Sequence, residues 1–181
     1  MTDPNQDPIE ELARYLRQGI GAEMRAEAEE AERESHQGRL RRRTMSDIGR
    51  ECANRGDRVR ARTAVRTVVG RVDHVGADYL TIVTEEQACD VRLDRCTLTI
   101  ETSASGGHST QRGSVTLKAR LAEYEQTGEP VTIVCAGVDA EVDGVVAVAA
   151  TDHVVVVDAD DRRTVVPYAL IDLVVRPLPT R

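Results

Sequence analysis

Two halves of the chain carry the same order of glycines, aspartates and apolar runs. The phrase GADYLTIV at residues 76–83 returns as ATDHVVVV at residues 150–157. A fixed period of this length indicates an internal duplication, so the chain is predicted to fold as two copies of one small unit. The matched pairs are Gly56 with Gly128 and, at a separation two positions longer, Gly70 with Gly144, Asp78 with Asp152 and Val91 with Val165.

Each copy is predicted to begin with a short helix. Met45, Ile48 and Cys52 share one face of a helix over 45–54, which Gly56 is placed to end. The second helix repeats this pattern with Leu117, Leu121 and Tyr124, and Gly128 ends it. After each glycine the apolar period changes to two, which predicts four or five short strands in each copy.

The composition favours strands in the core. The chain has no Phe or Trp and only four Tyr, so its apolar content is mainly Val, Ala, Leu and Ile. One helix and about five short strands in each copy cannot bury both faces of an open sheet. We therefore expect a mainly β protein with helices, built as two tandem small β-barrels, each preceded by a short helix, behind an N-terminal helical arm.

The duplicated glycines and aspartates have expected structural roles. Gly70 and Gly144 lie inside strand patterns, where a strand bends sharply or another backbone approaches closely. Asp78 and Asp152 precede apolar strands and are predicted to be turn residues that accept hydrogen bonds from nearby backbone N–H groups.

The order of helix, bent strand with glycine, Asp-led apolar strand and terminal strand resembles the Sm-like fold, over residues 44–101 and again over 116–176. The resemblance implies RNA binding and assembly through edge strands. The tandem layout also resembles, more loosely, two-repeat proteins common in actinobacteria.

The chain departs from the Sm-like pattern at the positions that bind bases. The interval from each glycine to its aspartate is two positions longer than the family usually has. The family's base-binding Asn is absent, with Thr81 or Val155 in its neighbourhood, and VPYAL at 166–170 replaces its basic last turn. Because only Arg92 remains as a partial substitute, the uridine pocket of the family does not carry over.

The expected domain boundaries follow from these patterns. An amphipathic helix is predicted to start near Asp7 and Pro8, and a solvated helix to follow to residue 36. RLRRRT is expected to break the helical pattern. The expected segments are a helical arm and basic linker at 1–43, barrels at 44–101 and 116–176, a flexible Gly/Ser-rich linker at 102–115 and a tail at 177–181.

One stretch of the acidic chain is basic. The net charge is −7, yet residues 39–71 hold eleven arginines against three acidic residues. Arg58, Arg60 and Arg62 alternate with apolar residues, so on a strand their guanidinium groups share a face at about 7 Å spacing. The predicted nucleic-acid-binding residues are Arg41, Arg42, Arg43, Arg50, Arg55, Arg58, Arg60 and Arg62.

This basic stretch has two interpretations. The first is a nucleic-acid-binding protein, for RNA in the first place or for DNA, that contacts phosphates with low sequence selectivity because aromatic residues are scarce. The second is an arginine row that solvates an edge strand, pairs with the acidic helix at 23–34 or binds an acidic protein partner. In the corresponding alternative function, the protein is an assembly or adaptor module whose helix at 8–36 docks a partner.

The sequence gives no sign of catalysis or of a cofactor. No Ser, Cys or His lies in a recognisable nucleophile context, and the four cysteines form no CxxC pair. DADD at 158–161 is predicted to be a solvated turn rather than a metal site. We therefore expect a non-enzymatic cytoplasmic protein with reduced thiols, without cofactor, metal or membrane contact, that can form a homo-oligomer.

Overall fold

The structure of the protein is a computed structural model that describes residues 30, 32–38, 40–102, 106, 113–137 and 141–178. The chain divides into two compact units, Met1–Arg43 and Thr44–Arg181. In the first unit, residues 32–38 and 40–42 are helical and almost all are exposed. RLRRRT was expected to break the helical pattern, but residues 40–42 are helical, so the helix ends only after Arg42. The amphipathic helix expected near the N-terminus lies outside the described residues.

Two helices open the two repeats of the second unit. Helix α2 (Met45–Arg55) follows Thr44, whose side chain accepts from the backbone of Asp47 while the Asp47 carboxylate bonds back to Thr44. Helix α3 (Leu117–Thr127) begins after Thr116 in the same way, without the reciprocal bond. Both helices end at a left-handed glycine, Gly56 with φ 74° and Gly128 with φ 65°, so the predicted helices and their stops are confirmed.

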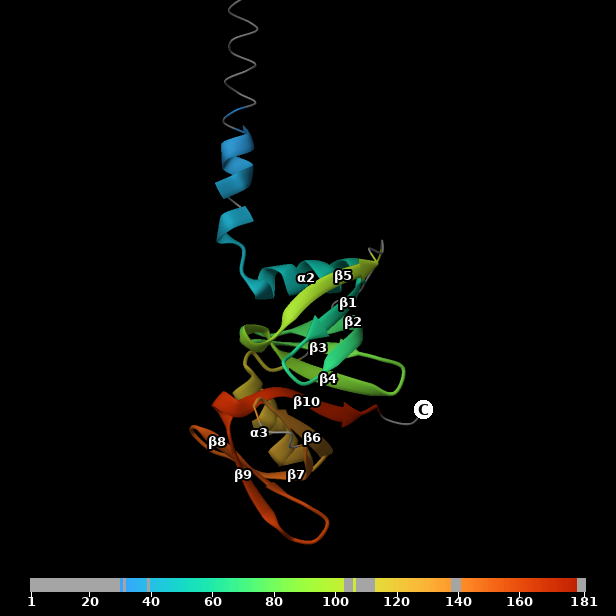
Figure 1. The fold of residues 1–181 in the computed structure, drawn as a ribbon, viewed down its shortest axis with the longest axis vertical. Coiled ribbons are helices and arrows are strands. Elements are labelled where there is room, and N and C mark those ends of the chain that lie inside the picture. Colours follow the sequence, from blue (N-terminus) through green and yellow to red (C-terminus); the bar gives the residue numbers. More distant parts are fainter. Residues whose placement is uncertain are drawn as a thin grey trace, which may run out of the picture. The chain divides into compact units, whose positions relative to one another are not determined.

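Each repeat contributes five strands to one sheet (Figure 1). The first repeat forms β1 (Arg58–Arg62), β2 (Thr67–Val75), β3 (Tyr79–Val83), β4 (Gln87–Arg92) and β5 (Thr97–Thr102). The second forms β6 (Pro130–Cys135), β7 (Glu141–Ala149), β8 (His153–Val157), β9 (Arg163–Pro167) and β10 (Ile171–Pro177). Short 3-10 helices, η1 (Leu93–Arg95) and η2 (Tyr168–Leu170), precede the last strand of each repeat.

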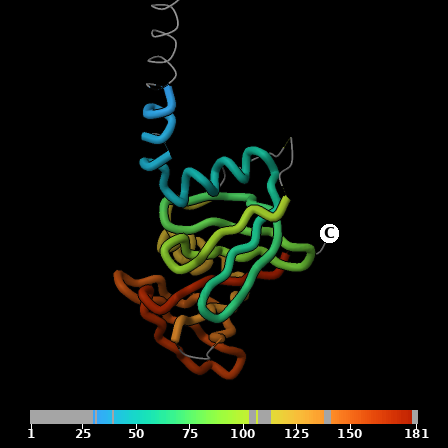
Figure 2. Tube along the Cα trace, turned by 45° about the horizontal axis from the view of Figure 1, so that its top comes forward, coloured from blue at the N-terminus to red at the C-terminus, as the bar shows by residue number. Residues whose placement is uncertain are grey.

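The two expected closed barrels are wrong. The strands form a single ten-stranded antiparallel sheet in the order β5-β1-β2-β3-β4-β10-β6-β7-β8-β9. Within a repeat, the last strand pairs with the first but not with the fourth, so neither repeat closes on itself. The edge of β4 is instead paired by β10 of the other repeat, and two views agree that these strands run side by side (Figures 1 and 2). Pairing between repeats thus replaces closure within them.

Strand β10 separates two apolar cores. Leu173 and Val175 point into the first core, beside Val91, and Val174 points into the second. Helix α2 packs on β2 over the first core, and helix α3 packs on β7 over the second. Because β10 is buried on both faces, the second repeat completes the core of the first.

The strand register refines the match between the repeats. Thr81 pairs with Asp90, and Val155, which matches Thr81 in the duplicated phrase, pairs with Val165. Val165 is therefore the counterpart of Asp90, and the counterpart of Val91 is Val166 rather than the predicted Val165. The reason is one additional residue in the turn before β9, which is closed by a hydrogen bond from Asp158 to Arg162, whereas the turn before β4 is closed by one from Thr84 to Gln87.

The duplicated glycines lie where two backbones meet, as predicted. A Cβ atom on Gly70 would lie 2.3 Å from the carbonyl oxygen of Val83, and one on Gly144 would lie 2.2 Å from that of Val157. Both distances are far below van der Waals contact, so each position requires glycine.

The predicted turn position of Asp78 is confirmed, because it lies in the bend between β2 and β3, but its expected hydrogen-bond partner is wrong. Its carboxylate accepts from the backbone N–H of Leu117 at 2.8 Å, so it caps a helix distant in the sequence rather than a nearby turn. Asp152 bonds the ring of His153 at 2.7 Å. The end of the expected flexible linker is also fastened here, because the carbonyl of Val115 accepts from Ala77 and that of Ser114 accepts from Tyr79.

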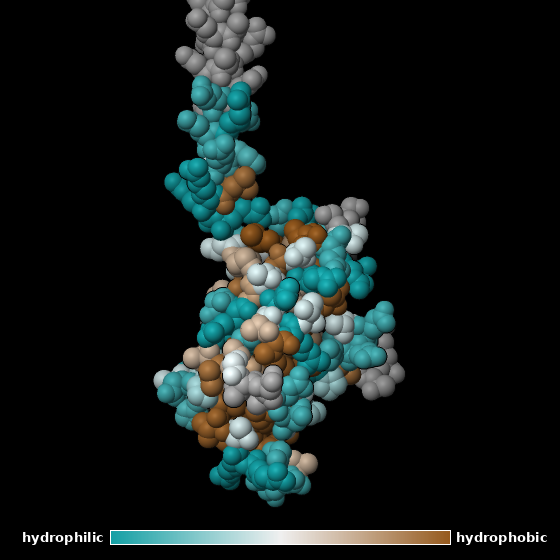
Figure 3. Space-filling view, in the orientation of Figure 1, coloured by the Kyte–Doolittle hydropathy of each residue, from teal (hydrophilic) through white to brown (hydrophobic). Residues whose placement is uncertain are grey.

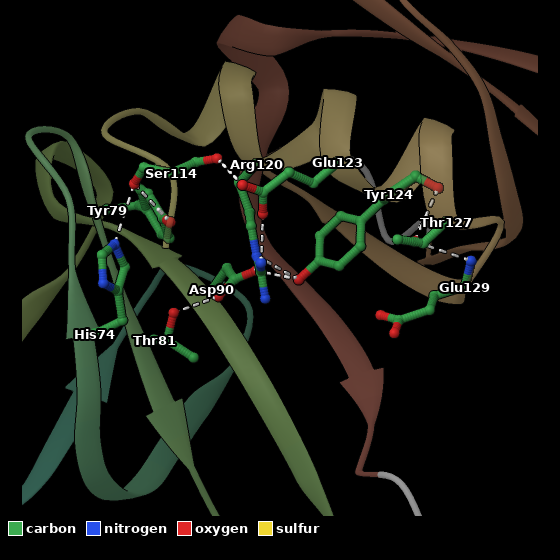
Figure 4. A network of polar contacts seen from close by, with 10 residues as sticks. All are labelled: His74, Tyr79, Thr81, Asp90, Ser114, Arg120, Glu123, Tyr124, Thr127 and Glu129. Atoms are coloured by element: carbon green, nitrogen blue, oxygen red, sulfur yellow. Dashed lines mark hydrogen bonds and ion pairs between the residues drawn. The ribbon is translucent and has the colours of Figure 1, made fainter. Parts of the chain in front are cut away.

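A buried polar network joins α3 to the first repeat (Figure 4). Asp90 on β4 is fully buried and accepts from the hydroxyl groups of Thr81, at 2.6 Å, and Tyr124. Arg120 adds an ion pair to Asp90 at 3.3 Å and a second one to Glu123 at 2.6 Å. Burial, with Asp90 next in importance, raises the pKa of Tyr124 far above its ordinary value. The Tyr124 hydroxyl therefore stays a donor at any physiological pH.

Candidate nucleic-acid interface

Strand β1 presents a row of arginines on its exposed face. Its residues alternate between exposed and buried, so Val59 and Ala61 enter the first core and Arg58, Arg60 and Arg62 face the opposite side. Helix α2 packs against that same core, on the other face of β1 from the arginines. Side-chain exposure is 60% for Arg58 and 50% for Arg60, so these two guanidinium groups are in contact with solvent.

The structure adds a fourth arginine that the sequence prediction did not include. Arg71 on β2 is the register partner of Arg58 and is exposed on the same face. The signal for it was present in the sequence. The turn at 63–66 sets Arg62 opposite Thr67, and this register places Arg58 opposite Arg71. We call Arg58, Arg60, Arg62 and Arg71 the arginine face.

One carboxylate lies within the arginine face. Glu101 on β5 accepts from Arg60 Nε at 2.7 Å and lies 3.6 Å from Arg58 Nε. Among the described residues, no ion pair involves Arg62 or Arg71. Four guanidinium groups against one carboxylate leave a local excess of positive charge, unlike the self-neutralising pairs found elsewhere on this unit.

A groove lined by Arg58 and Arg71 borders the arginine face on one side. It runs along the β3–β4 hairpin, where Glu85 and Glu86 line it. A polyanion is repelled by these carboxylates. The favourable path for a phosphate chain therefore runs along β1 toward Arg60 and Arg62, away from the hairpin.

The two predicted arginines of α2 lie outside the arginine face. Arg50 pairs with Asp47 at 3.1 Å. Arg55 pairs with Glu51 at 2.9 Å and with the fully buried Asp57 at 3.1 Å. Because α2 lies on the core side of β1, the structure does not bring Arg50 and Arg55 together with the row on β1. Their charges are balanced within their own helix and its end.

The three predicted arginines of the linker belong to the other unit. Arg41, Arg42 and Arg43 are exposed at the end of the helix in Met1–Arg43. The backbone N–H of Arg43 donates to the carbonyl of Leu40 at 3.3 Å, so this helix ends at the boundary between the units.

The second repeat carries no equivalent of the arginine face. Val59 lies opposite Gly70 as Val131 lies opposite Gly144, so the counterparts of Arg58, Arg60 and Arg62 are Pro130, Thr132 and Val134. Thr132 bonds Asp143, and Val134 is buried in the first core. The basic surface is thus a property of one repeat.

The surface of the second repeat has a different character. Figure 3 shows apolar side chains gathered over this repeat. Val145, Val148 and Val165 are exposed there. These three valines offer a phosphate chain no partner of opposite charge.

The remaining candidate groups are occupied by structural contacts. Arg92 bonds Asp94 and the carbonyl of Tyr168, so it ties η1 to η2. Tyr79 and Tyr124 are buried, which leaves no exposed ring for base stacking among the described residues of the first repeat. Burial raises the pKa of Cys89 to about 11, so this thiol is protonated at neutral pH.

The expected hairpin turn at 158–161 is confirmed. Asp158 accepts from the backbone N–H groups of Asp160 and Arg162, and the turn is exposed. No cluster of three or more His, Cys, Asp or Glu suited to a metal occurs among the described residues. None of the helices in that part of the chain is long and apolar enough to cross a membrane.

No protein-family model matches this chain, and no curated protein matches it.

Proposed function

We propose that the protein is a non-enzymatic, cytoplasmic nucleic-acid-binding protein that holds the phosphate backbone of RNA, or of DNA, on its arginine face. The observation that carries the proposal is the solvent exposure of the row on β1, with Arg71 beside it and Glu101 as the single carboxylate of the described residues that is bonded to it. Guanidinium groups bind phosphate oxygens through paired hydrogen bonds, and their release of counterions drives binding.

The spacing and surroundings of the row indicate how it binds. Alternate residues on a strand are about 7 Å apart, so successive guanidinium groups can contact successive phosphates of an extended single strand. Base readout needs donors, acceptors or rings aimed at base edges, and the face supplies only charge. Binding is therefore selective for polyanions and weakly dependent on sequence.

The direct test compares two double variants with the same change in net charge. Arg60→Gln with Arg62→Gln removes half of the arginine face, whereas Arg162→Gln with Arg163→Gln removes two exposed arginines from the second repeat. Fluorescence anisotropy at low salt, with labelled single-stranded RNA and DNA, should show loss of affinity only for the first variant. Equal loss in both variants would show that net charge, rather than the arginine face, determines binding.

An acidic polypeptide separates the two partner classes. If labelled poly-aspartate binds the wild-type protein and neither RNA nor DNA does, the arginine face serves an acidic protein partner and the proposal fails. If nucleic acid binds and poly-aspartate competes only weakly, the proposal stands.

A further inference from the structure

A pocket lies between the two repeats, at one end of the arginine face. Its volume is about 570 Å³, in the range of sites that bind small ligands. The first repeat lines it with Arg62, the start of the following turn and residues 94–97, and the second repeat lines it with Ala136 and Asp172. Because Arg62 is the last arginine of the row on β1, a strand held on the arginine face reaches this pocket.

The carboxylate of Asp172 is buried at this pocket without a donor. Asp172 is 1% exposed, and its Oδ2 has no hydrogen-bond partner among the described residues. Strand β10 pairs with β6 at Ile171 and again at Leu173, so a bulge leaves Asp172 out of the register. A buried carboxylate without a partner costs free energy, and a ligand that donates hydrogen bonds to it offsets this cost.

The other charged groups of the pocket favour an anion at its mouth. The carboxylate of Asp94 is paired with Arg92 at 2.6 Å. Arg95 donates to a backbone carbonyl of η2 at 2.5 Å, which fixes the position of its guanidinium group. Neither Arg62 nor Arg95 forms an ion pair among the described residues. A matching ligand therefore carries hydrogen-bond donors for Asp172 and a negative charge for Arg62.

The donor pattern of the four RNA bases selects one of them. Guanine carries two adjacent donors, N1–H and the N2 amino group, on its pairing edge, and a carboxylate has two oxygens that can accept from both. Adenine, cytosine and uracil each place an acceptor beside their donor on that edge, and a carboxylate repels this acceptor. Guanine is therefore the base whose edge matches Asp172.

We propose that this pocket binds a guanine base of the strand whose phosphates lie on the arginine face, with the carboxylate of Asp172 accepting from N1–H and N2–H. The inference rests on the proposed function and adds the identity of one base to it. The arginine face supplies only charge, so this pocket is where a base is distinguished, at a single nucleotide of the strand.

The walls of the pocket suit a flat ring. Ala64, Cys96 and Ala136 give it small side chains that leave room for a purine. The guanidinium group of Arg95, held by its bond to η2, can stack on the ring, as arginine side chains do on unpaired bases. This contact replaces the aromatic ring that the first repeat does not expose among its described residues.

Uridine oligomers that differ at one central nucleotide test the pocket. In fluorescence anisotropy with the wild-type protein, an oligomer with one guanine should bind about tenfold more tightly than one with adenine. Hypoxanthine lacks the N2 amino group, so it should lose most of this gain. Equal affinity for guanine and adenine would overturn the guanine pocket and leave the proposed function intact.

A variant of the carboxylate gives a second test. Asp172→Asn keeps the size of the side chain, and its amide offers one acceptor and one donor. It should lose the preference for guanine and favour xanthine, which carries an oxygen in place of the N2 amino group. Asp161→Asn changes the net charge equally in an exposed turn, where φ is 61° and Asn is well tolerated, so it should keep the guanine preference. Persistent guanine preference in Asp172→Asn would contradict the proposal.

Protection of Cys96 tests the pocket in the wild-type protein without a phosphate chain. Cys96 lines the pocket and is half-buried, so a bound base covers its thiol. At pH 8, millimolar guanosine monophosphate should slow the alkylation of Cys96 by iodoacetamide, measured by mass spectrometry, whereas adenosine monophosphate should not. Cys89, buried in the first core, is the internal control. Equal rates with both nucleotides would overturn the proposal, whereas protection by guanosine monophosphate without binding of any oligomer would retain the guanine pocket and overturn the proposed function.

Discussion

Tyr124 on α3 of the second repeat donates its hydroxyl hydrogen to the buried carboxylate of Asp90 on β4 of the first. The bond crosses the boundary between the repeats, where β4 and β10 join the two halves of the sheet. Arg120 and Thr81 complete the coordination of the same carboxylate. The two repeats are therefore held by a specific polar contact as well as by a shared apolar core.

The hydrogen bond from Tyr124 to Asp90 predicts that removal of a single hydroxyl group destabilises the protein. Tyr124→Phe removes one donor from a buried carboxylate and should lower the free energy of unfolding by about 2 kcal/mol, as expected for hydrogen bonds to charged groups. Tyr168→Phe is the matched control, because its hydroxyl bonds the carbonyl of Ala150 in a half-buried site and should cost about 1 kcal/mol or less. Urea denaturation measures both changes. If the two variants lost the same free energy of unfolding, the hydrogen bond from Tyr124 to Asp90 would have no special role in holding the repeats together.

We predict that the fold does not tolerate even one added methyl group at Gly70. Gly70→Ala places a Cβ against the carbonyl oxygen of Val83, and rigid overpacking of this kind costs about 1–3 kcal/mol. Gly38→Ala, which meets no atom within 4 Å, is the control and should leave the stability unchanged or slightly raised. Thermal unfolding followed by circular dichroism checks the pair. The close approach would be disproved by a Gly70→Ala variant as stable as the wild type.

The raised pKa values of two thiols predict a loss of stability at alkaline pH. Burial raises the pKa of Cys89 and of Cys96 to about 11, above the ordinary value of about 8.5. The folded state therefore holds these protons more tightly than the unfolded state. This stabilisation is complete below about pH 8.5 and is lost as the pH rises toward 11.

Alkylation tests the same property at one pH. At pH 8, iodoacetamide should label the native thiols slowly and all four cysteines rapidly in denaturant, since only the thiolate reacts. Mass spectrometry counts the adducts. Rapid native labelling of Cys89 would show that it is not buried as described.

We predict that removal of the negative charge of Glu101 raises the affinity for nucleic acid. Its carboxylate engages Arg60 and lies near Arg58, so it competes with phosphate for both guanidinium groups. Glu101→Gln should therefore increase the affinity for single-stranded RNA several-fold at low salt. Glu141→Gln, on the second repeat, changes the net charge equally and should have a smaller effect. Anisotropy titrations compare the two, and equal effects would remove the specific role of Glu101.

The elements of the fold could be predicted because their signals are local. The Thr–Gly limits of both helices and the period-two pattern after each glycine depend on neighbouring residues only. The joining of the two repeats could not be predicted in this way. Whether β4 pairs within its own repeat or with β10 depends on contacts between residues far apart in the sequence, such as Asp90 and Val174.

The candidate interface could be predicted from the sequence only in part, for the same reason. The alternation along β1 identified Arg58, Arg60 and Arg62, since a strand sets their face directly. Counting basic residues along the chain also included Arg50 and Arg55, whose acidic partners lie within one turn of α2 or just after it. Arg71 required the register of β1 with β2, and Glu101 required the pairing of β1 with β5.

The dependence of nucleic-acid affinity on salt tests the central claim most directly. If the four guanidinium groups of the arginine face each neutralise one phosphate, the logarithm of the association constant should fall against the logarithm of the salt concentration with a slope of about −3 for a single strand. Arg60→Gln with Arg62→Gln should reduce that slope to about −1.5. A slope that is the same for the wild-type protein and this variant, or no binding at low salt, would contradict the account.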